Sequence, residues 1–340
     1  MCGPPKNGEW TTQRTFTSGA RLACAERTVQ AEALLQLLVC PACRSNLEWR
    51  EDGARCTGCG ASYEIADGIR VLRPAESEGA NPQKEFQASF FDEADPDFEV
   101  SRPHGAPWLY QWLLAEKFRR SIAALPVSPQ GMTAVTICGG SGMDAEFLAR
   151  MGASVISTDI SLGAAQRTRE RAERYGFAVL PVVADAEALP LRDRSVDLLY
   201  VHDGLHHLDS PQAGIREMLR TSRLAISINE PARARATMLA ARVGLSEHYE
   251  EAGNFIARID PEWLAAEVSA AGFEVVRNER YAMVYRHEPG RAARFLSLPG
   301  LRKVTAGALR SFNAVAGGIG NKLTLQAVRK DRARTDAAPR

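Results

Sequence analysis

The sequence contains no run of apolar residues approaching the roughly 18 to 20 that a membrane-spanning helix needs. Residues 1–30 also lack the apolar stretch of a secretory signal. Neither sign of charge dominates, because 42 lysines and arginines are balanced by 41 aspartates and glutamates. No overall field therefore favours nucleic acid or a membrane as the partner, although a local basic patch stays compatible with this balance. These absences predict a cytoplasmic protein without a transmembrane segment.

Length and composition predict one large core with a small satellite domain. The chain has 340 residues, of which 45% are hydrophobic and 24% charged. Residues 1–30 and 331–340 have the composition of disordered tails, and residues 74–85 that of a linker. We therefore expect a small domain over residues 31–73 and a catalytic domain over residues 86–330.

The stretch from Thr133 to Ser161 has the pattern of a βαβ unit. A β-favouring run leads into a glycine turn and then into a helical pattern. A second β-rich run ends at Asp159, which follows Gly142 by 17 residues. A carboxylate at the end of that strand can accept hydrogen bonds from both hydroxyls of a ribose. The glycine turn and Asp159 together predict an adenosine-containing ligand. The segment from Gly140 to Ala145 also matches the dinucleotide fingerprint, so NAD stays open at this point.

Segments further along the chain carry a more specific pattern. A third strand runs into Asp185 and Ala186, the motifs Leu-Pro-Leu and Ser-Val-Asp follow, and a fourth strand leads into a His-His-Leu sequence. With these motifs, residues 86–330 resemble the class I S-adenosylmethionine-dependent methyltransferases, most closely the branch related to ubiquinone and menaquinone biosynthesis. The resemblance implies an α/β fold with a Rossmann-like, seven-stranded sheet, and S-adenosyl-L-methionine as the cofactor.

The resemblance also implies roles for single residues. The glycine loop would pass the methionine part of the cofactor, Asp159 would hold the ribose, and Asp185 with Ala186 would lie against the adenine. The cofactor-binding candidates are Gly139, Gly140, Gly142, Asp159, Ile160, Asp185, Ala186 and His202.

Two positions depart from the family pattern. Thr136 stands where relatives usually carry an acidic residue that helps to hold the cofactor's amino group, and Cys138 replaces the usual first glycine. A degenerate, non-catalytic Rossmann-like domain is therefore the alternative interpretation.

Two paired cysteine motifs predict a metal site. Cys40 and Cys43 form one C-x-x-C, and Cys56 and Cys59 form the other. Each motif places two thiolates on one side of a metal, and two motifs complete the tetrahedral shell that zinc prefers. All four positions are cysteine, so the zinc should be structural.

The residues around these cysteines, from Leu34 to Leu72, resemble the small zinc-ribbon protein that activates several methyltransferases by binding them. The ribbon would stabilise the enzyme or present a substrate, or it would be an inert structural appendage.

The acceptor site is expected beyond the fourth strand, because ligands of open α/β sheets bind at the carboxyl ends of the strands. His206 is the first candidate for a general base, with His207 and Asp203 behind it. The alternative is that one or both histidines only pack the turn. The predicted function is methyl transfer to a small-molecule acceptor, with O-methylation of a sugar, quinone or natural-product hydroxyl.

Two alternatives remain for the function. RNA or protein methylation is favoured by the ribbon but not by the charge balance, and an Asn-Pro-Pro-Tyr type of motif is lacking after the fourth strand. A non-catalytic partner subunit of another methyltransferase is motivated by Thr136. A homodimer is compatible with the sequence in each case.

The remaining patterns predict elements around the sheet. The aromatics between Phe86 and Val100 either fold over the cofactor or anchor the chain, and helices are expected over residues 108–125, 233–253 and 261–271. Residues 273–285 and 323–328 are the last two predicted strands. The basic, amphipathic insertion between them, residues 286–320, is a substrate lid, a surface for a lipid-linked or anionic acceptor, or a structural cap.

Overall fold

The computed structural model describes residues 32–74, 81–232, 259–283 and 289–331. It divides into two compact units. Of the described residues, the glycine-loop unit holds 32–74, 81–100 and 127–226, and the C-terminal unit holds 101–126, 227–232, 259–283 and 289–331. The predicted N-terminal tail and the predicted helix over residues 233–253 lie outside the described residues, as do residues 75–80 of the predicted linker and residues 332–340 of the C-terminal tail.

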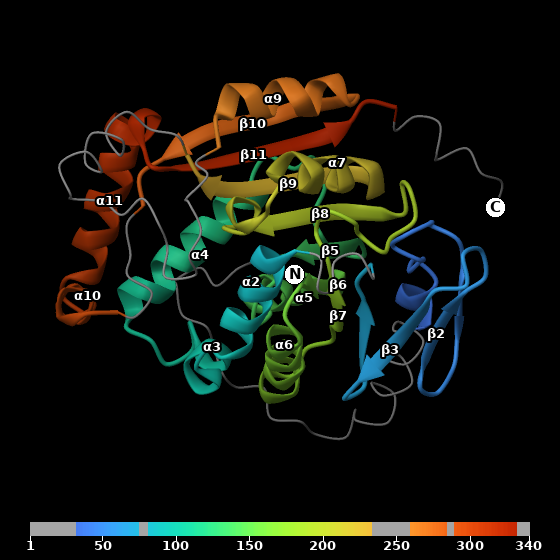
Figure 1. Cartoon of the computed structure of the whole chain (residues 1–340). Coiled ribbons are helices and arrows are strands. Elements are labelled where there is room, and N and C mark those ends of the chain that lie inside the picture. The colour runs from blue at the N-terminus through green and yellow to red at the C-terminus, as the bar shows by residue number, and fades with distance from the viewer. Residues whose placement is uncertain (1–31, 75–80, 233–258, 284–288, 332–340) are drawn as a thin grey trace. The chain divides into compact units, whose positions relative to one another are not determined.

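The strands of the glycine-loop unit, which includes the first half of β9, lie in the order β1-β2-β3-β4-β7-β6-β5-β8-β9 (Figure 1). Their bounds are β1 Leu47–Trp49, β2 Gly53–Cys56, β3 Ser62–Ala66, β4 Ile69–Leu72, β5 Thr133–Ile137, β6 Ser154–Asp159, β7 Leu180–Ala184, β8 Val196–His202 and β9 Ser222–Pro231. The central pairs β7–β6, β6–β5 and β5–β8 are parallel, which confirms the predicted βαβ unit and places several strand ends at one edge.

The described residues form eleven strands, so the prediction of a seven-stranded sheet is wrong. Strands β5 to β11 account for the seven, and the four extra strands come from the segment that contains the paired cysteines. They join the sheet because β4 runs parallel to β7, with Val71 opposite Val183. Ile69 and Val71 are buried against Ala165 and Val183, so the ribbon shares the core of the unit.

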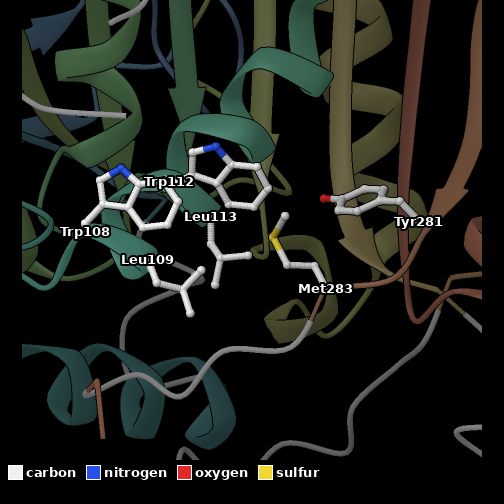
Figure 2. Close-up of a cluster of buried hydrophobic side chains, with 6 residues drawn as sticks. All are labelled: Trp108, Leu109, Trp112, Leu113, Tyr281 and Met283. Carbon is white, nitrogen blue, oxygen red and sulfur yellow. The ribbon is translucent and has the colours of Figure 1, made fainter. Parts of the chain in front are cut away.

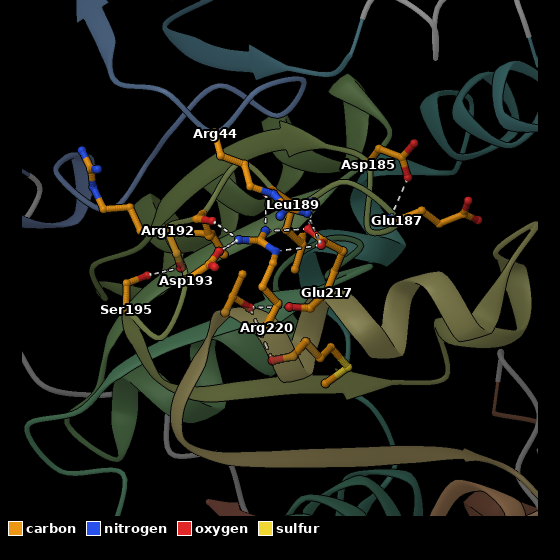
Figure 3. A network of polar contacts seen from close by, with 12 residues as sticks. Arg44, Asp185, Glu187, Leu189, Arg192, Asp193, Ser195, Glu217 and Arg220 are labelled. Carbon is orange, nitrogen blue, oxygen red and sulfur yellow. Dashed lines mark hydrogen bonds and ion pairs between the residues drawn. The ribbon is translucent and has the colours of Figure 1, made fainter. Parts of the chain in front are cut away.

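The ribbon is also held by the Leu-Pro-Leu motif. The Val39 N–H donates to the Pro190 carbonyl at 3.0 Å, and the Arg192 N–H donates to the Leu37 carbonyl at 3.1 Å. In Figure 3, a polar network lies next to this contact and is centred on Glu217, which accepts from Arg220 and, at 3.4 Å, from Arg44 of the ribbon. The motif thus supports the ribbon through its backbone.

The helices of this unit begin and end at recognisable caps. They are α2 Pro82–Asp92, α3 Pro96–Ser101, α5 Met143–Arg150, α6 Leu162–Tyr175, the short 3₁₀ helix η2 Leu205–His207 and α7 Pro211–Thr221. Asn81 caps α2 by accepting from the N–H groups of Gln83 and Lys84, so this helix begins within the stretch predicted as a linker. Ser161 caps α6 in the same way, and the left-handed Gly176 ends that helix.

A buried ion pair joins α5, α6 and α3. Arg171 donates to Glu146 at 3.0 Å, and both side chains are fully buried. The same guanidinium donates to the carbonyls of Glu99 and Val100, each at 3.0 Å. Because a buried charge needs partners on every side, this arrangement fixes α3 against the helices that flank the glycine loop.

The C-terminal unit packs helices against an antiparallel hairpin. Its elements are α4 Trp108–Ile122, α9 Pro261–Ala270, β10 Phe273–Tyr281, α10 Arg291–Leu296, α11 Arg302–Ala316, η3 Gly317–Ile319 and β11 Lys322–Arg329, and β11 lies between β9 and β10. Figure 2 shows the buried cluster that Trp108, Trp112, Tyr281 and Met283 form with two leucines of α4. Among the described residues, every helix is too short or too polar to span a lipid bilayer.

Candidate active site and metal centre

The glycine loop follows β5 and turns sharply into α5. Cys138, Gly140 and Gly142 all have left-handed φ angles, of 50°, 53° and 79°. Such angles are easy for glycine, whereas Cys138 adopts a conformation that costs an ordinary residue energy. A Cβ on Gly139 would lie 2.4 Å from the Ser157 hydroxyl oxygen, so only glycine fits where the loop crosses β6. A Cβ on Gly140 would meet nothing within 4 Å, which leaves space above the loop.

Asp159 ties this loop to the end of β6. One carboxylate oxygen accepts from the Gly140 N–H at 2.9 Å, and the other accepts from the Ser161 N–H at 3.0 Å. Burial raises the pKa of Asp159, although the backbone N–H groups and Arg167 oppose that shift. Each oxygen keeps a second lone pair, so the carboxylate can still accept from two hydroxyl groups. The neighbouring Ile160 is half-buried.

Thr136 and its neighbours form a neutral, buried hydroxyl network. The Thr136 hydroxyl donates to the Ser157 hydroxyl at 3.0 Å, and the Thr158 hydroxyl donates to the Thr136 carbonyl at 3.1 Å. Thr136 is only 1% exposed. The position therefore offers no negative charge to a cofactor.

Asp185, at the end of β7, lies under helix α2. Its carboxylate accepts from the Lys84 ammonium at 2.7 Å, and Glu187 accepts from the same ammonium at 3.0 Å. Burial lowers the pKa of Lys84, but these two hydrogen bonds outweigh it and the pKa is raised. Figure 3 shows Asp185 and Glu187 joined through the Glu187 N–H. Ala186 is buried beside them.

Helices α2 and α3 cross several of the predicted site segments, and we call residues 82–100 the strap. The Gln87 side chain donates to the His207 carbonyl at 2.5 Å. Asp92 accepts from the Ser161 hydroxyl at 2.6 Å, and Glu99 accepts from the Ser141 hydroxyl at 2.8 Å. The aromatics of this segment were predicted from the sequence, but the roles of these polar residues were not, because contacts between distant segments leave no local pattern.

The candidate acid–base residues lie at and after the end of β8. The His202 Nδ1 is 2.9 Å from an Asp144 oxygen, and its Nε2 is 3.6 Å from the Asp203 carboxylate. The rings of His206 and His207 have centroids 4.1 Å apart. His206 is 3% exposed, whereas His207 is half-buried and meets Phe91 of the strap edge-on at 5.5 Å.

The four cysteines come together as predicted. The sulfurs of Cys40, Cys43, Cys56 and Cys59 all lie within 4.8 Å of one another. The Cys40 and Cys59 sulfurs are 3.7 Å apart, and those of Cys43 and Cys56 are 3.3 Å apart. A tetrahedral zinc with bonds of about 2.3 Å separates its sulfurs by about 3.8 Å, so the donor set fits that metal.

Hydrogen bonds around the cluster favour a thiolate at Cys43 but not at Cys59. The Ala61 backbone lowers the pKa of Cys59, whereas hydrogen bonds with Cys43 and Cys56 raise it, to about 12. Ser45 lowers the pKa of Cys43 to about 6 through its side chain and its backbone. The Cys40 sulfur lies 3.1 Å from the Tyr63 hydroxyl, and the N–H groups of Gly58 and Cys59 donate to the Cys56 sulfur. Donors of this kind surround metal-bound sulfur.

Comparison with known proteins identifies the family. Residues 135–223 match the methyltransferase domain family. A demethylmenaquinone methyltransferase of Renibacterium salmoninarum is 26% identical over 40% of this chain and 54% of that protein. A ubiquinone/menaquinone biosynthesis C-methyltransferase (UbiE) of Acidiphilium cryptum is 32% identical over 47% of this chain and 73% of that protein. The chain belongs to the S-adenosylmethionine-dependent methyltransferases.

The fold of this methyltransferase agrees with a solved structure. The crystal structure of the [4+2]-cyclase SpnF superposes with a TM-score of 0.50 at 18% identity, over 73% of this chain and 96% of that one. At this identity the likeness concerns the fold alone. The chain spans about half the length of the Renibacterium methyltransferase, so the substrates of such relatives enter only as proposals.

The residues of this methyltransferase fit the family's cofactor at two points and depart from it at one. The open space above Gly140 and the two acceptor oxygens of Asp159 suit an adenosyl group with a chain that passes the loop. The neutral Thr136 does not suit an amino group. Besides Asp159, the Glu99 carboxylate also reaches the loop from another element, because it accepts from the Ser141 hydroxyl at 2.8 Å.

Proposed function

We propose that this chain transfers the methyl group of S-adenosylmethionine to a small-molecule acceptor. The observation that carries the proposal is the hydrogen bond from the Gly140 N–H to Asp159, which joins the glycine loop to the end of the neighbouring strand. A sulfonium cofactor supplies a methyl group that is already activated for displacement. The protein then has to hold the acceptor in line with it, which is worth about 7 to 11 kcal/mol in well-oriented systems.

In this proposal the predicted binding residues keep their roles. Asp159 and Ile160 hold the ribose, Asp185 and Ala186 lie against the adenine, and the glycines of the loop pass the methionine part. Lys84 secures the strap over Asp185 through its two ion pairs. His202 is fixed by Asp144 and positions the end of β8.

Among the acid–base candidates, we favour His207 as the group that takes a proton from the acceptor. It is half-buried and faces the strap, whereas His206 is almost fully buried and packs the turn. Asp203 adds negative charge nearby. A base contributes about 10² to 10⁴-fold in rate, so His207→Ala should lower turnover by that range.

The acceptor atom has two candidates. The prediction from the sequence is a hydroxyl oxygen, as in a sugar, a quinol or another natural product. The Acidiphilium relative is named a C-methyltransferase of ubiquinone and menaquinone biosynthesis, and this favours a carbon atom. Both reactions require removal of a proton from the acceptor, and so both are compatible with His207.

A methyl-transfer assay tests the function. The purified chain is incubated with S-adenosylmethionine labelled in its methyl group and with a panel of quinols, phenols and sugars. Transfer of label with a mass gain of one methyl group is expected for at least one quinol or phenol, and the carbon or oxygen attachment follows from nuclear magnetic resonance of the product. Cofactor binding without any transfer across the panel, or transfer to RNA or protein alone, would contradict the small-molecule proposal.

We further infer that Glu99 takes the place of the acid missing at Thr136. Its carboxylate is buried, accepts from Ser141 of the glycine loop, and stands on a helix whose backbone is held by Arg171. A carboxylate at this loop can pair with the cofactor's ammonium group, and hydrogen bonds to charged groups are worth about 1.5 to 3 kcal/mol.

The Glu99→Gln variant is therefore expected to bind S-adenosylmethionine about tenfold or more weakly. Its affinity for methylthioadenosine, which lacks the amino acid part, should be unchanged. Calorimetric titration with both ligands measures the difference, and Asp97→Asn on the exposed side of the same helix is the matched control. Equal weakening for both ligands would mean that Glu99 only supports the loop.

The cysteine cluster is proposed to hold a structural zinc. The four sulfurs complete its coordination, so the metal takes no part in methyl transfer. Its role in this proposal is to keep the ribbon folded, and with it the β4 strand that lies against β7.

A further inference from the structure

The segment between β10 and β11 has an unusual composition. Residues 289–320 contain five basic side chains, Arg291, Arg294, Arg302, Lys303 and Arg310, and no aspartate or glutamate. The chain as a whole is nearly neutral, with a formal net charge of +1. The segment is therefore a local concentration of positive charge that the overall balance conceals.

The same segment carries most of the exposed apolar side chains. Nine large apolar residues are exposed in the described part of the chain, and seven of them lie here. They are Phe295, Leu296, Leu298, Val304, Phe312, Val315 and Ile319. Val315 is 90% exposed and Phe312 is 56% exposed, whereas single exposed apolar residues elsewhere are ordinary.

Helix α11 is apolar on two opposite faces. Its inner face packs through Ala306 and Leu309 against the tryptophan cluster of Figure 2, and Asn313 bonds to the backbone of Ala282. Val304, Phe312 and Val315 lie on the other side of the helix, by the spacing of an α-helix. Packing of the inner face explains why the helix covers the tryptophan cluster. It does not explain why apolar side chains are exposed on the outer face.

Basic side chains occur on the same two helices, and two of them lie over the inner cluster. Arg291, Arg294 and Lys303 are exposed on α10 and at the start of α11. Arg302 and Arg310 lie over Trp108 and Trp112, at 5.7 Å and 5.5 Å from the ring centroids. A helix surface with exposed phenylalanine, valine and leucine beside arginine and lysine has the composition of an interfacial helix, which lies in the headgroup region of a bilayer.

We propose that α10 and α11 dock the protein on an anionic lipid surface. This inference rests on the proposed function and narrows its substrate class to acceptors carried in a membrane, such as a quinol with an apolar chain. Charge complementarity argues for lipid over a second copy of the chain, because a symmetric contact through this face would bring the exposed Arg291, Arg294 and Lys303 of both copies together without an acid. The exposed apolar side chains argue for lipid over nucleic acid, which offers phosphates but no apolar layer.

Flotation of the full-length protein with lipid vesicles tests the proposal without any acceptor or cofactor. Vesicles of phosphatidylcholine alone are compared with vesicles in which a third of the lipid is phosphatidylglycerol. The protein should float with the anionic vesicles and much less with the neutral ones, and added salt should reduce the binding. Equal binding to both kinds of vesicle, or to neither, would overturn the proposal.

Two pairs of variants assign the binding to this face. Phe312→Ser with Val315→Ser should weaken vesicle binding on the order of tenfold or more, because the apolar side chains no longer enter the bilayer. Arg291→Ala with Lys303→Ala should weaken it about fivefold for each charge removed. The matched controls are Val127→Ser and Arg216→Ala, which remove an exposed apolar and an exposed basic side chain elsewhere.

Two further measurements separate the remaining outcomes. Binding of S-adenosylmethionine, measured by calorimetric titration, verifies that each variant is folded. If the parent protein itself did not bind S-adenosylmethionine, that result would count against the proposed function and not against docking. Sedimentation of the protein alone reports self-association. Variants that abolish a dimer while vesicle binding persists would overturn the lipid assignment and identify this face as an interface between two copies.

Discussion

An Asp159→Ala variant is expected to bind S-adenosylmethionine about a hundredfold or more weakly than the parent protein. Without the carboxylate, the ribose would lose two charge-assisted hydrogen bonds, each worth about 1.5 to 3 kcal/mol. The substitution would also release the Gly140 N–H, so the glycine loop would lose its link to the end of β6. Calorimetric titration measures the affinity, with NAD as a second ligand.

The matched control for this prediction is Asp193→Ala, because that side chain is 66% exposed and pairs with Arg220 away from the loop. The control should bind S-adenosylmethionine as the parent protein does. Unchanged affinity in Asp159→Ala would place the ribose elsewhere, and NAD binding by the parent protein would restore the dinucleotide interpretation of the glycine loop.

The stability of an Asp159→Asn variant should show that this residue serves binding rather than folding. Burial raises the pKa of Asp159 in the folded protein. An unfolded aspartate titrates near 3.9, so the free energy of unfolding falls as pH rises from about that value to the folded pKa. Above this window the ionised carboxylate lowers stability. Asn removes that charge but leaves one of the two backbone N–H groups facing its amide nitrogen, so the melting temperature at pH 7 should change little. A clear loss of stability would contradict this account.

Removal of zinc is the second change with a large expected effect. Structural zinc contributes about 10 to 16 kcal/mol of apparent binding free energy in small zinc domains. Strand β4 lies beside β7, and Ile69 and Val71 share a core with Ala165. Treatment with a strong chelator, or Cys56→Ser, should therefore lower the melting temperature of the glycine-loop unit and expose β7 to hydrogen exchange, rather than melt the ribbon alone.

Metal analysis provides the control for this prediction. The parent protein should contain one zinc per chain, and Cys138→Ser should keep it, because Cys138 lies outside the cluster. Free thiols at all seven cysteines of a metal-free protein with an unchanged melting temperature would show that the cluster is not a zinc site.

Local patterns in the sequence predicted the parts of the fold that depend on neighbouring residues. The βαβ unit ending at Asp159, the helix that begins at Trp108 and the two cysteine pairs were predicted from short segments, and the structure confirms them as elements. Each depends on spacing or periodicity within about 30 residues, which is visible in the chain itself.

Contacts between distant segments could not be predicted in this way. The apolar run of β4 is compatible with a separate ribbon or with any sheet edge, and only packing against β7 and α6 decides between them. The same holds for Lys84 with Asp185 and for Glu99 with Ser141. Charged residues in a polar segment are ordinary in a sequence, and their partners lie too far along the chain to form a motif.

The pairing of β4 with β7 has a consequence for assembly. A zinc protein that binds a methyltransferase as a separate chain must compete for its partner, and its occupancy depends on the concentrations of both. Here the ribbon strand already lies along the outer side of β7 within the same chain. Its local concentration is fixed by covalent linkage, so one ribbon accompanies every catalytic sheet at any dilution. Supply of the ribbon thus cannot serve as a switch for this chain.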